Sequence, residues 1–270
     1  MSMILSDWMK RLRGGSARKR RAIIFLAWGE EHIAEMHRCI DESTLPDYPI
    51  FLITDHDTPI PAPHPRVTVR RVDFKLMGLK GHARCGELWD HIPPEFDTYL
   101  YLDVDTRILG DISLGFDKAE QHSMALAQAA HYSLEHFRNY SEVMIAEGVE
   151  PRGQLIYGAG VIFFARNTHV EKVMREYRRL CAQYSDTPEA RWGDQPHLSL
   201  AMELHGINPY TLSTGFNHRA FGEWISGEIR VWHSYKPVPE NVNVLDPIFP
   251  RCYSRDAKEI VSAGRLRLVK

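Results

Sequence analysis

The sequence predicts an α/β protein whose central sheet contains parallel strands. Two short, continuous apolar runs, residues 22–27 and 49–54, have the length and composition of buried strands. Residues 31–42 between them carry apolar side chains at helical spacing, so strand, helix and strand follow one another as a βαβ unit. A third apolar run ends at residue 102, and a chain of 270 residues can enclose a large core.

The remaining elements follow from the same periodicities. The helix at residues 168–184 shows the clearest apolar stripe, and Thr168 with Glu171 predicts a capping box at its start. Prolines after residue 240 predict an extended segment over the surface. Further strands are expected at residues 67–72, 123–127, 157–165 and 229–232, and helical segments at residues 83–89, 134–146 and 198–204.

The composition is that of an ordinary globular protein. Hydrophobic residues make up 44% and charged residues 25%, which excludes the disordered and fibrous classes. The four cysteines show no metal-ligand or redox-motif spacing, which indicates a reducing compartment. No apolar run reaches the roughly 18 residues of a membrane span, and no signal-peptide core is present. We therefore expect the protein to work in the cytosol.

Charge is distributed unevenly along the chain. Residues 1–21 contain seven basic residues and one acidic residue, Asp7, and so carry a charge of +6. Because the net charge of the whole chain is −2, the remaining residues carry −8. This basic N-terminal tail either lies on an anionic membrane surface, as a peripheral contact, or is simply solvated. Nucleic-acid binding is not expected, because the remainder is acidic and has no basic recognition module. The predicted organisation is the tail, one domain over residues 22–240, and a C-terminal extension over residues 241–270 packed on or beside that domain.

The strand ending at residue 102 runs into a pair of carboxylates, Asp103 and Asp105. Because side chains alternate along a strand, the two aspartates point to one face and Val104 to the other. Like charges this close require a divalent cation, a proton on one carboxylate, or full solvation. Ligands of open α/β sheets bind at the edge where the strands end. For an isolated Asp-X-Asp, a solvated turn is the simplest explanation, so the rest of the chain must decide.

Three later segments carry further candidate residues. Gly158 and Gly160 open an apolar strand, which indicates a bend, a bulge at a sheet edge, or a close approach to the backbone. Asp194 stands where a helix N-cap is expected, and capping alone would account for it. His233 ends the last strand, and Asn217 is expected to be a turn residue.

Taken in order, these features form a known pattern. The aspartate pair, the glycine-opened strand, Asp194-Gln195 before a helix, and His233 with Lys236 after a late strand resemble the GT-A nucleotide-sugar glycosyltransferases. The resemblance is greatest to the glycogenin-like family 8 of retaining enzymes and runs from residue 22 to residue 237. It implies a GT-A, Rossmann-like fold with a central mixed, mainly parallel sheet flanked by helices. It also implies transfer of a sugar from a nucleotide-sugar donor, a UDP-hexose, to a glycan or lipid-linked glycan acceptor, with retention.

The resemblance also implies roles for individual residues. Asp103, Asp105 and His233 match the ligands of Mn²⁺ or Mg²⁺, and mixed carboxylate and imidazole ligation suits Mn²⁺. Lys236 matches a lysine that, together with the cation, neutralises the departing diphosphate. Asp194 and Gln195 match the catalytic pair beside the reacting carbon. The other implied donor contacts are Ala27, Trp28, Arg84 with Lys80 as a second candidate, Val104, Gly158, Ala159 and Gly160.

The sequence departs from the family pattern at two places and leaves two other functions open. The loop between His233 and Lys236 is shorter by three residues than the family motif, and Trp28 stands where a tyrosine often stacks on the base. A haloacid-dehalogenase-like phosphohydrolase also has Asp-X-Asp after a strand, but Thr106 follows the second aspartate directly and no late paired-aspartate motif is present. A non-catalytic nucleotide-sugar-binding protein is the other alternative.

Overall fold

The computed structural model of the protein describes residues 19–76, 81–186, 192–240, 242–243, 250–256 and 258–262. Most of the basic tail, residues 1–18, and Lys80 lie outside the described residues, so the expectations about them stay predictions. Arg21, counted above with the tail, is the first residue of a strand, where its guanidinium pairs with Glu120 at 2.9 Å and Asp117 at 2.5 Å.

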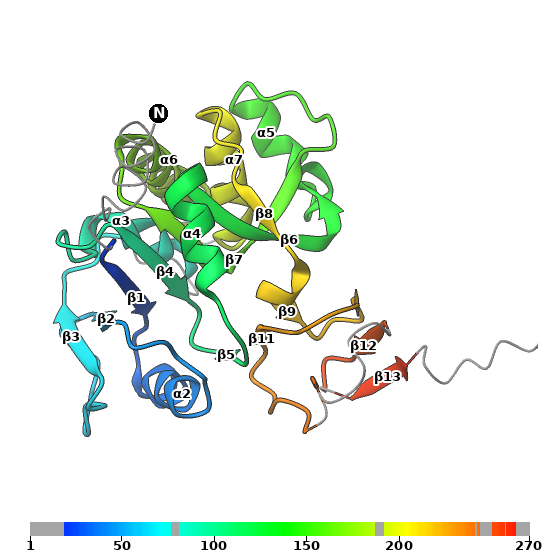
Figure 1. Cartoon of the computed structure of the whole chain (residues 1–270). Coiled ribbons are helices and arrows are strands. Elements are labelled where there is room, and N and C mark those ends of the chain that lie inside the picture. Colours follow the sequence, from blue (N-terminus) through cyan, green and yellow to red (C-terminus); the bar gives the residue numbers. More distant parts are fainter. Residues whose placement is uncertain are drawn as a thin grey trace, which may run out of the picture.

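The main sheet has seven strands: β1 (Arg21–Leu26), β2 (Ile50–Thr54), β3 (Val67–Arg71), β4 (Thr98–Leu102), β6 (Met124–Ser133), β7 (Leu155–Ala165) and β8 (Tyr210–Leu212). Their order is β3-β2-β1-β4-β7-β6-β8 (Figure 1). β3, β2, β1 and β4 are parallel, β7 is antiparallel to both of its neighbours, and β8 is parallel to β6. In this sheet β7 alone runs against the others, so the predicted mixed, mainly parallel sheet is confirmed.

Helices cover both faces of this sheet (Figure 1). On one face, α2 (Glu30–Asp41) and α4 (Ser113–His122) contribute residues such as Ile33 and Phe116 to a core with alternate strand residues. On the other, α6 (Thr168–Tyr184) and α7 (Gln195–Leu204) contribute Tyr177 and Leu198. The central strands are thus buried on both sides, which explains why they appear in the sequence as continuous apolar runs.

The helix expected at residues 134–146 is interrupted, and that prediction is wrong. The chain forms a 3₁₀ turn, η2 (Leu134–His136), and a separate helix, α5 (Ser141–Ala146). Between them, Arg138 and Asn139 have φ values of 52° and 59°. This left-handed conformation cannot continue a right-handed helix. The expected segment at residues 83–89 is likewise a 3₁₀ helix, η1 (His82–Glu87), that continues into α3 (Leu88–His91).

The N-terminus of α6 also differs from the prediction. Asn167 is the N-cap, and its side-chain oxygen accepts a hydrogen bond from the Val170 N–H at 2.9 Å. Thr168 is the first helical residue, so it does not form the predicted capping box with Glu171. The helix begins where expected because asparagine satisfies the same free N–H groups at a helix start.

Two smaller sheets complete the described structure. One has the order β5-β11-β9, with β5 (Thr106–Ile108), β11 (Val231–His233) and β9 (His218–Arg219), and η3 (Thr214–Phe216) precedes β9. The other has the order β10-β12-β13, with β10 (Trp224–Ile225), β12 (Arg251–Tyr253) and β13 (Glu259–Ser262). The C-terminal segment was expected to be extended, and part of it pairs as strands. No helix among the described residues has the length and apolar character needed to cross a bilayer.

Candidate active site

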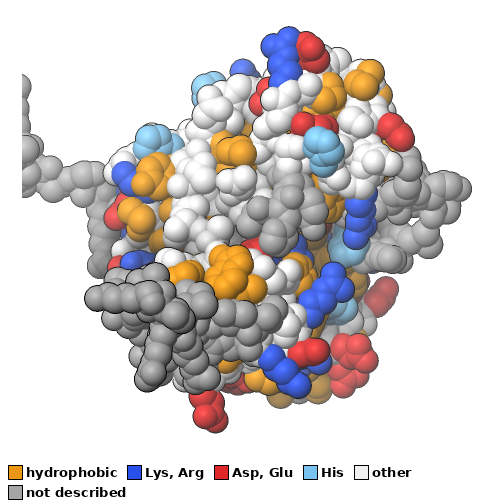
Figure 2. Space-filling model, turned by 90° about the vertical axis from the view of Figure 1, so that its right-hand side faces the viewer, with side chains coloured by type: hydrophobic (Ala, Val, Ile, Leu, Met, Phe, Trp, Pro, Cys, Tyr) orange, Lys and Arg blue, Asp and Glu red, His pale blue; other side chains and the backbone are white. Residues whose placement is uncertain are grey.

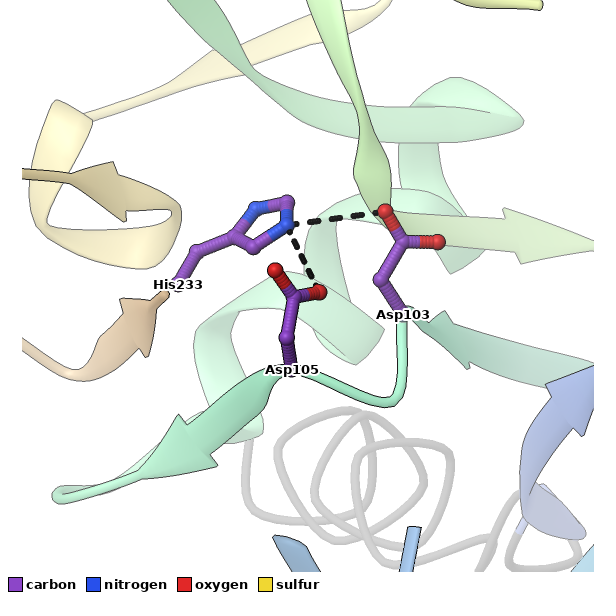
Figure 3. A group of neighbouring side chains, drawn as sticks. All are labelled: Asp103, Asp105 and His233. Carbon is purple, nitrogen blue, oxygen red and sulfur yellow. Dashed lines mark ion pairs between the residues drawn. The ribbon is translucent and has the colours of Figure 1, made fainter. Parts of the chain in front are cut away.

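Asp103 and Asp105 lie in the turn between β4 and β5, and His233 approaches them from β11 (Figure 3). β4 ends at Leu102, so the aspartates share a face because of the turn and not because of strand alternation, which corrects the sequence argument. The Thr106 N–H donates to the Asp103 carbonyl at 3.2 Å and closes this turn. Pairing of β11 with β5 places His233 opposite Thr106. The small sheet therefore brings the histidine to the aspartate pair.

The three side chains converge on a small volume. Nε2 of His233 lies 3.5 Å from Oδ2 of Asp103 and 3.2 Å from Oδ1 of Asp105. One ligand atom from each residue lies within 4.8 Å of the other two. Two carboxylates and an imidazole in this arrangement can hold a divalent cation.

Asn217 fixes the orientation of the His233 ring. Nδ1 of His233 and Oδ1 of Asn217 are 2.7 Å apart, and both residues are buried. With the amide oxygen as acceptor, Nδ1 carries the proton and Nε2 presents its lone pair toward the aspartates. Such an outer contact selects the tautomer that binds a metal. Gly158 makes room for this contact, because a Cβ at residue 158 would lie 2.3 Å from Nδ2 of Asn217.

Gly160 makes room for two of the metal-ligand candidates, His233 and Asp103. A Cβ at this position would lie 2.3 Å from Cε1 of His233 and 2.5 Å from Oδ2 of Asp103. The Gly160 carbonyl also accepts a hydrogen bond from the Asp103 N–H at 2.8 Å. At the two glycines the structure supports a close approach to the backbone and also a bulge, because the pairing of β7 with β6 is irregular between Tyr157 and Ile162, inside the sheet and not at its edge. The approaching groups are side chains of the site.

The titration behaviour of the cluster indicates a place for positive charge. Burial raises the pKa of Asp103 to about 6; His233 opposes this shift, and the carboxylates of Asp105 and Asp194 add to it. Burial acts to lower the pKa of His233, but the charges of Asp105 and Asp103 outweigh it and raise that pKa. The same pairing outweighs burial at Asp105 and lowers its pKa. In the free protein a proton on His233 balances the carboxylates, and a divalent cation can replace that proton.

Asp194 and Gln195 lie beside this cluster. Asp194 occupies the N-cap position of α7, but its side chain makes no capping bond and accepts instead from the Tyr177 hydroxyl at 2.8 Å. Capping therefore does not account for Asp194. Gln195 accepts at 3.5 Å from Nη1 of Arg219.

A second group of predicted residues lies at the same edge of the sheet. β1 and β4 are parallel, with Phe25 beside Leu102, so the segments after them leave the sheet together. There the Arg84 guanidinium lies 4.7 Å from the Trp28 ring centroid and donates to Oδ2 of Asp55 at 2.8 Å. Arg84 thus has a carboxylate partner within the protein, and its contact with a donor stays a prediction.

Three of the predicted donor contacts are almost fully buried. Ala27, Val104 and Ala159 all lie in the core, with exposed fractions of 3%, 7% and 4%. They therefore offer little surface to a donor, and their predicted contacts stay predictions.

Lys236 lies in the exposed loop after His233. The Ser234 N–H donates to the Asp105 carbonyl at 2.8 Å, and the Lys236 N–H donates to Oγ of Ser234 at 3.1 Å. Partial burial, with the charges of Asp105 and Asp103, raises the pKa of Tyr235 to about 12. The shortened loop is therefore anchored directly on the aspartate turn.

The sequence did not identify several residues of this site. Asn217 was expected to be a turn residue, and Arg219, Tyr101 and Tyr177 were not singled out. Tyr101 donates to Oδ1 of Asp103 at 2.7 Å, as Tyr177 does to Asp194. Asn217 and Tyr177 acquire their roles from partners 16 and 17 residues away, so no local pattern marks them. Tyr101 lies only two residues from Asp103, but within an apolar strand run it is indistinguishable from a core residue.

Comparison with known proteins agrees with this architecture. No protein-family model and no curated protein matches the sequence. Among solved structures, mouse xyloside xylosyltransferase 1 is 12% identical with a TM-score of 0.51, over 82% of this chain and 99% of that one. An active-site mutant of LgtC is 13% identical with a TM-score of 0.55, over 82% and 91%. The bifunctional glycosyltransferase WbbM is 12% identical with a TM-score of 0.53, over 82% and 46%.

Identity this low establishes the fold only. Each of the three structures aligns with 82% of this chain at a TM-score above 0.5. The chain therefore has the GT-A fold of these glycosyltransferase structures.

Proposed function

We propose that the protein is a metal-dependent glycosyltransferase that moves a sugar from a nucleotide-sugar donor, a UDP-hexose, to a glycan or lipid-linked glycan acceptor. The observation that carries this proposal is the convergence of Asp103, Asp105 and His233 within 4.8 Å at the end of β4 in a GT-A fold. Ligands of open α/β sheets bind at this edge. Neither the phosphohydrolase nor the non-catalytic binding protein is favoured by this fold and cluster together.

The residues of the cluster fit a divalent cation of the Mn²⁺ or Mg²⁺ type. Two carboxylates and one imidazole form a mixed oxygen and nitrogen donor set, which suits Mn²⁺. Asn217 holds the imidazole in the ligating tautomer, and Gly160 leaves the space that the ligands occupy. When bound, the cation would neutralise charge that develops on the diphosphate.

The reaction breaks the bond between the anomeric carbon and a diphosphate oxygen, and the electron pair leaves with the diphosphate. The acceptor oxygen forms the new bond to the anomeric carbon, and its proton passes to an oxygen of the departing diphosphate. We assign Lys236 to the departing diphosphate and Asp194 with Gln195 to the reacting sugar. Tyr177 holds the Asp194 carboxylate at 2.8 Å and so fixes its direction. Trp28 and Arg84, with the backbone of Ala27, Val104 and the segment 158–160, complete the proposed donor site.

Retention of anomeric configuration is part of the proposal. It rests on Asp194 and Gln195, which stand at the start of α7 where an acidic or amide oxygen can lie beneath the anomeric carbon. NMR of the product linkage tests it, and an inverted anomer would contradict it.

The basic tail is proposed to hold the enzyme on an anionic membrane surface near a lipid-linked acceptor. Its charge supports this, since each basic residue near such a surface contributes about 1 kcal/mol. A variant that lacks residues 1–18 leaves Arg21 and its ion pairs in place. We expect this variant to lose binding to vesicles with anionic lipids, and unchanged binding would remove the idea.

Titration with Mn²⁺ and a UDP-hexose tests the central proposal. We expect donor binding only with the metal, and loss of that binding in Asp105→Ala while the melting curve remains cooperative. Asp47→Ala removes an exposed carboxylate elsewhere and serves as the matched control. Donor binding that does not depend on metal would refute the proposed site.

A further inference from the structure

β9 places the positively charged side chain of Arg219 beside the metal-ligand cluster. β9 and β11 are parallel, with Arg219 opposite His233 and His218 opposite Trp232. Residues opposite one another in neighbouring strands point to the same face of a sheet, so Arg219 shares the face of His233, and His218 with Trp232 points to the other. Asn217 contacts His233 at 2.7 Å, so this shared face is the site side. His218 packs against Trp232 and Tyr253 in the separate apolar cluster below.

The Arg219 guanidinium has no carboxylate partner in the part of the chain that the structure describes. No carboxylate oxygen of a described Asp or Glu lies within 4.0 Å of its nitrogen atoms. Burial acts to raise the pKa of nearby Asp105, whereas His233, a backbone hydrogen bond and, as the smallest of these effects, the charge of Arg219 lower it. Among the described residues, the one hydrogen-bond partner of Arg219 is Oε1 of Gln195 at 3.5 Å, and its buried Nε atom has no acceptor. A half-buried cation with an unused donor is costly unless a ligand completes its contacts.

The ring of Phe221 packs against the Arg219 guanidinium and orients it. The Arg219 Cζ atom lies 4.6 Å from the Phe221 ring centroid, and Arg255 lies over the same ring at 5.0 Å. Phe221 is 44% exposed, and Figure 2 shows exposed hydrophobic side chains beside Lys and Arg on the face that includes β12 and β13. Stacking on an aromatic ring orients a guanidinium while leaving its edge donors free.

The carboxylates of the site have other partners, so the Arg219 guanidinium is available for a ligand. A divalent cation would balance Asp103 and Asp105, and Asp194 accepts from Tyr177. The loop that carries Lys236 is three residues shorter than the family motif, and Lys236 itself is exposed. A site that releases a diphosphate needs positive charge in addition to the metal.

We propose that Arg219 binds phosphate oxygens of the donor's nucleoside diphosphate, beside the metal and next to Gln195. This inference rests on the proposed function and adds a residue to it. A guanidinium presents parallel N–H donors that match two phosphate oxygens, which a single ammonium group cannot do. The contact would stabilise the diphosphate most as it departs, because its negative charge then increases.

Calorimetric titration of the full chain with UDP and with uridine, both at saturating Mn²⁺, tests the inference. We expect Arg219→Ala to weaken UDP binding by roughly 10- to 100-fold, the range for hydrogen bonds to a charged group, and to leave uridine binding unchanged. Arg219→Lys keeps the charge without the fork and should recover part of the loss. Arg255→Ala removes the other guanidinium on the same ring and is the matched control, with UDP binding equal to that of the parent.

The outcomes separate this inference from the function on which it rests. If the parent fails to bind UDP in Mn²⁺, both are overturned. If the parent binds UDP and Arg219→Ala binds it equally well, only the inference is overturned, and an anionic acceptor becomes the alternative partner of Arg219. Equal losses for UDP and uridine would also overturn it, because they indicate a general disturbance of the site. If Arg219→Ala does not fold, Arg219→Lys provides the test. A UDP affinity of Arg219→Lys equal to that of the parent would then overturn the bidentate contact.

Discussion

Replacement of Gly160 by alanine tests whether the glycine-opened strand exists to seat the metal ligands. The added Cβ would lie 2.3 Å from Cε1 of His233 and 2.5 Å from Oδ2 of Asp103. Ordinary contact begins at 3.4 Å, so the methyl group overlaps both ligands by about 1 Å. Neither side chain swings away freely, because Asn217 holds His233 at 2.7 Å and Tyr101 holds Asp103 at 2.7 Å.

The expected loss follows from this overlap. The two ligands must move by about 1 Å, whereas ligand distances in a metal site hold to within about 0.2 Å. We expect Mn²⁺ affinity to fall by about 10- to 100-fold, the range for disturbed outer contacts of metal ligands. Overpacking costs about 1–3 kcal/mol of the free energy of unfolding, which a protein with about 5–15 kcal/mol survives. The melting temperature should fall by about 2–4 °C for each kcal/mol.

Mn²⁺ titration followed by electron paramagnetic resonance measures the affinity directly, and thermal melting checks that the variant is folded. Gly193→Ala is the matched control, because the nearest atom to a Cβ there is Cγ of His82 at 4.0 Å and the backbone has no left-handed φ. We expect Gly193→Ala to bind Mn²⁺ like the parent. Equal Mn²⁺ affinity in Gly160→Ala and the parent would refute the assigned position of the cation.

Three further predictions concern the contacts and protons around the site. Asn217→Ala should lower Mn²⁺ affinity by about tenfold, because the ligating tautomer of His233 is no longer held. Asn217→Asp keeps the acceptor oxygen and should lower Mn²⁺ affinity less. Calorimetric titration measures both, and equal Mn²⁺ affinity in the parent and the two variants would contradict the role of Asn217. Mn²⁺ affinity should fall as the pH decreases through 6, because the pKa of Asp103 is raised to about 6 and the raised pKa of His233 favours its protonated form; a flat profile between pH 8 and about 5 would contradict this. Burial lowers the pKa of His197 to about 3, so the unfolded chain takes up its proton near pH 6.5 and the folded protein only near pH 3. Stability should therefore fall as the pH decreases through this window, by up to about 1.4 kcal/mol per pH unit from this residue; urea unfolding of His197→Gln should show a smaller pH dependence, and an unchanged slope would count against it.

Local patterns in the sequence were sufficient for most of the main sheet. The strands β1, β2 and β4 are continuous apolar runs because helices cover both of their faces, and the stripe of α6 marks the face that it buries. The helix over residues 134–146 failed as a prediction because left-handed φ values at Arg138 and Asn139 leave no mark on apolar spacing.

The sequence by itself determined the order of the elements and the chemical identity of the ligand candidates Asp103, Asp105 and His233, because these depend on residue types and on short-range periodicity. Only the tertiary structure decided that they meet, since His233 reaches the aspartates through the pairing of β11 with β5. It also decided that Asn217 orients His233 and that Arg219 faces the same site. Contacts of this kind depend on strand register, and residues far apart in the chain carry no local signal of it.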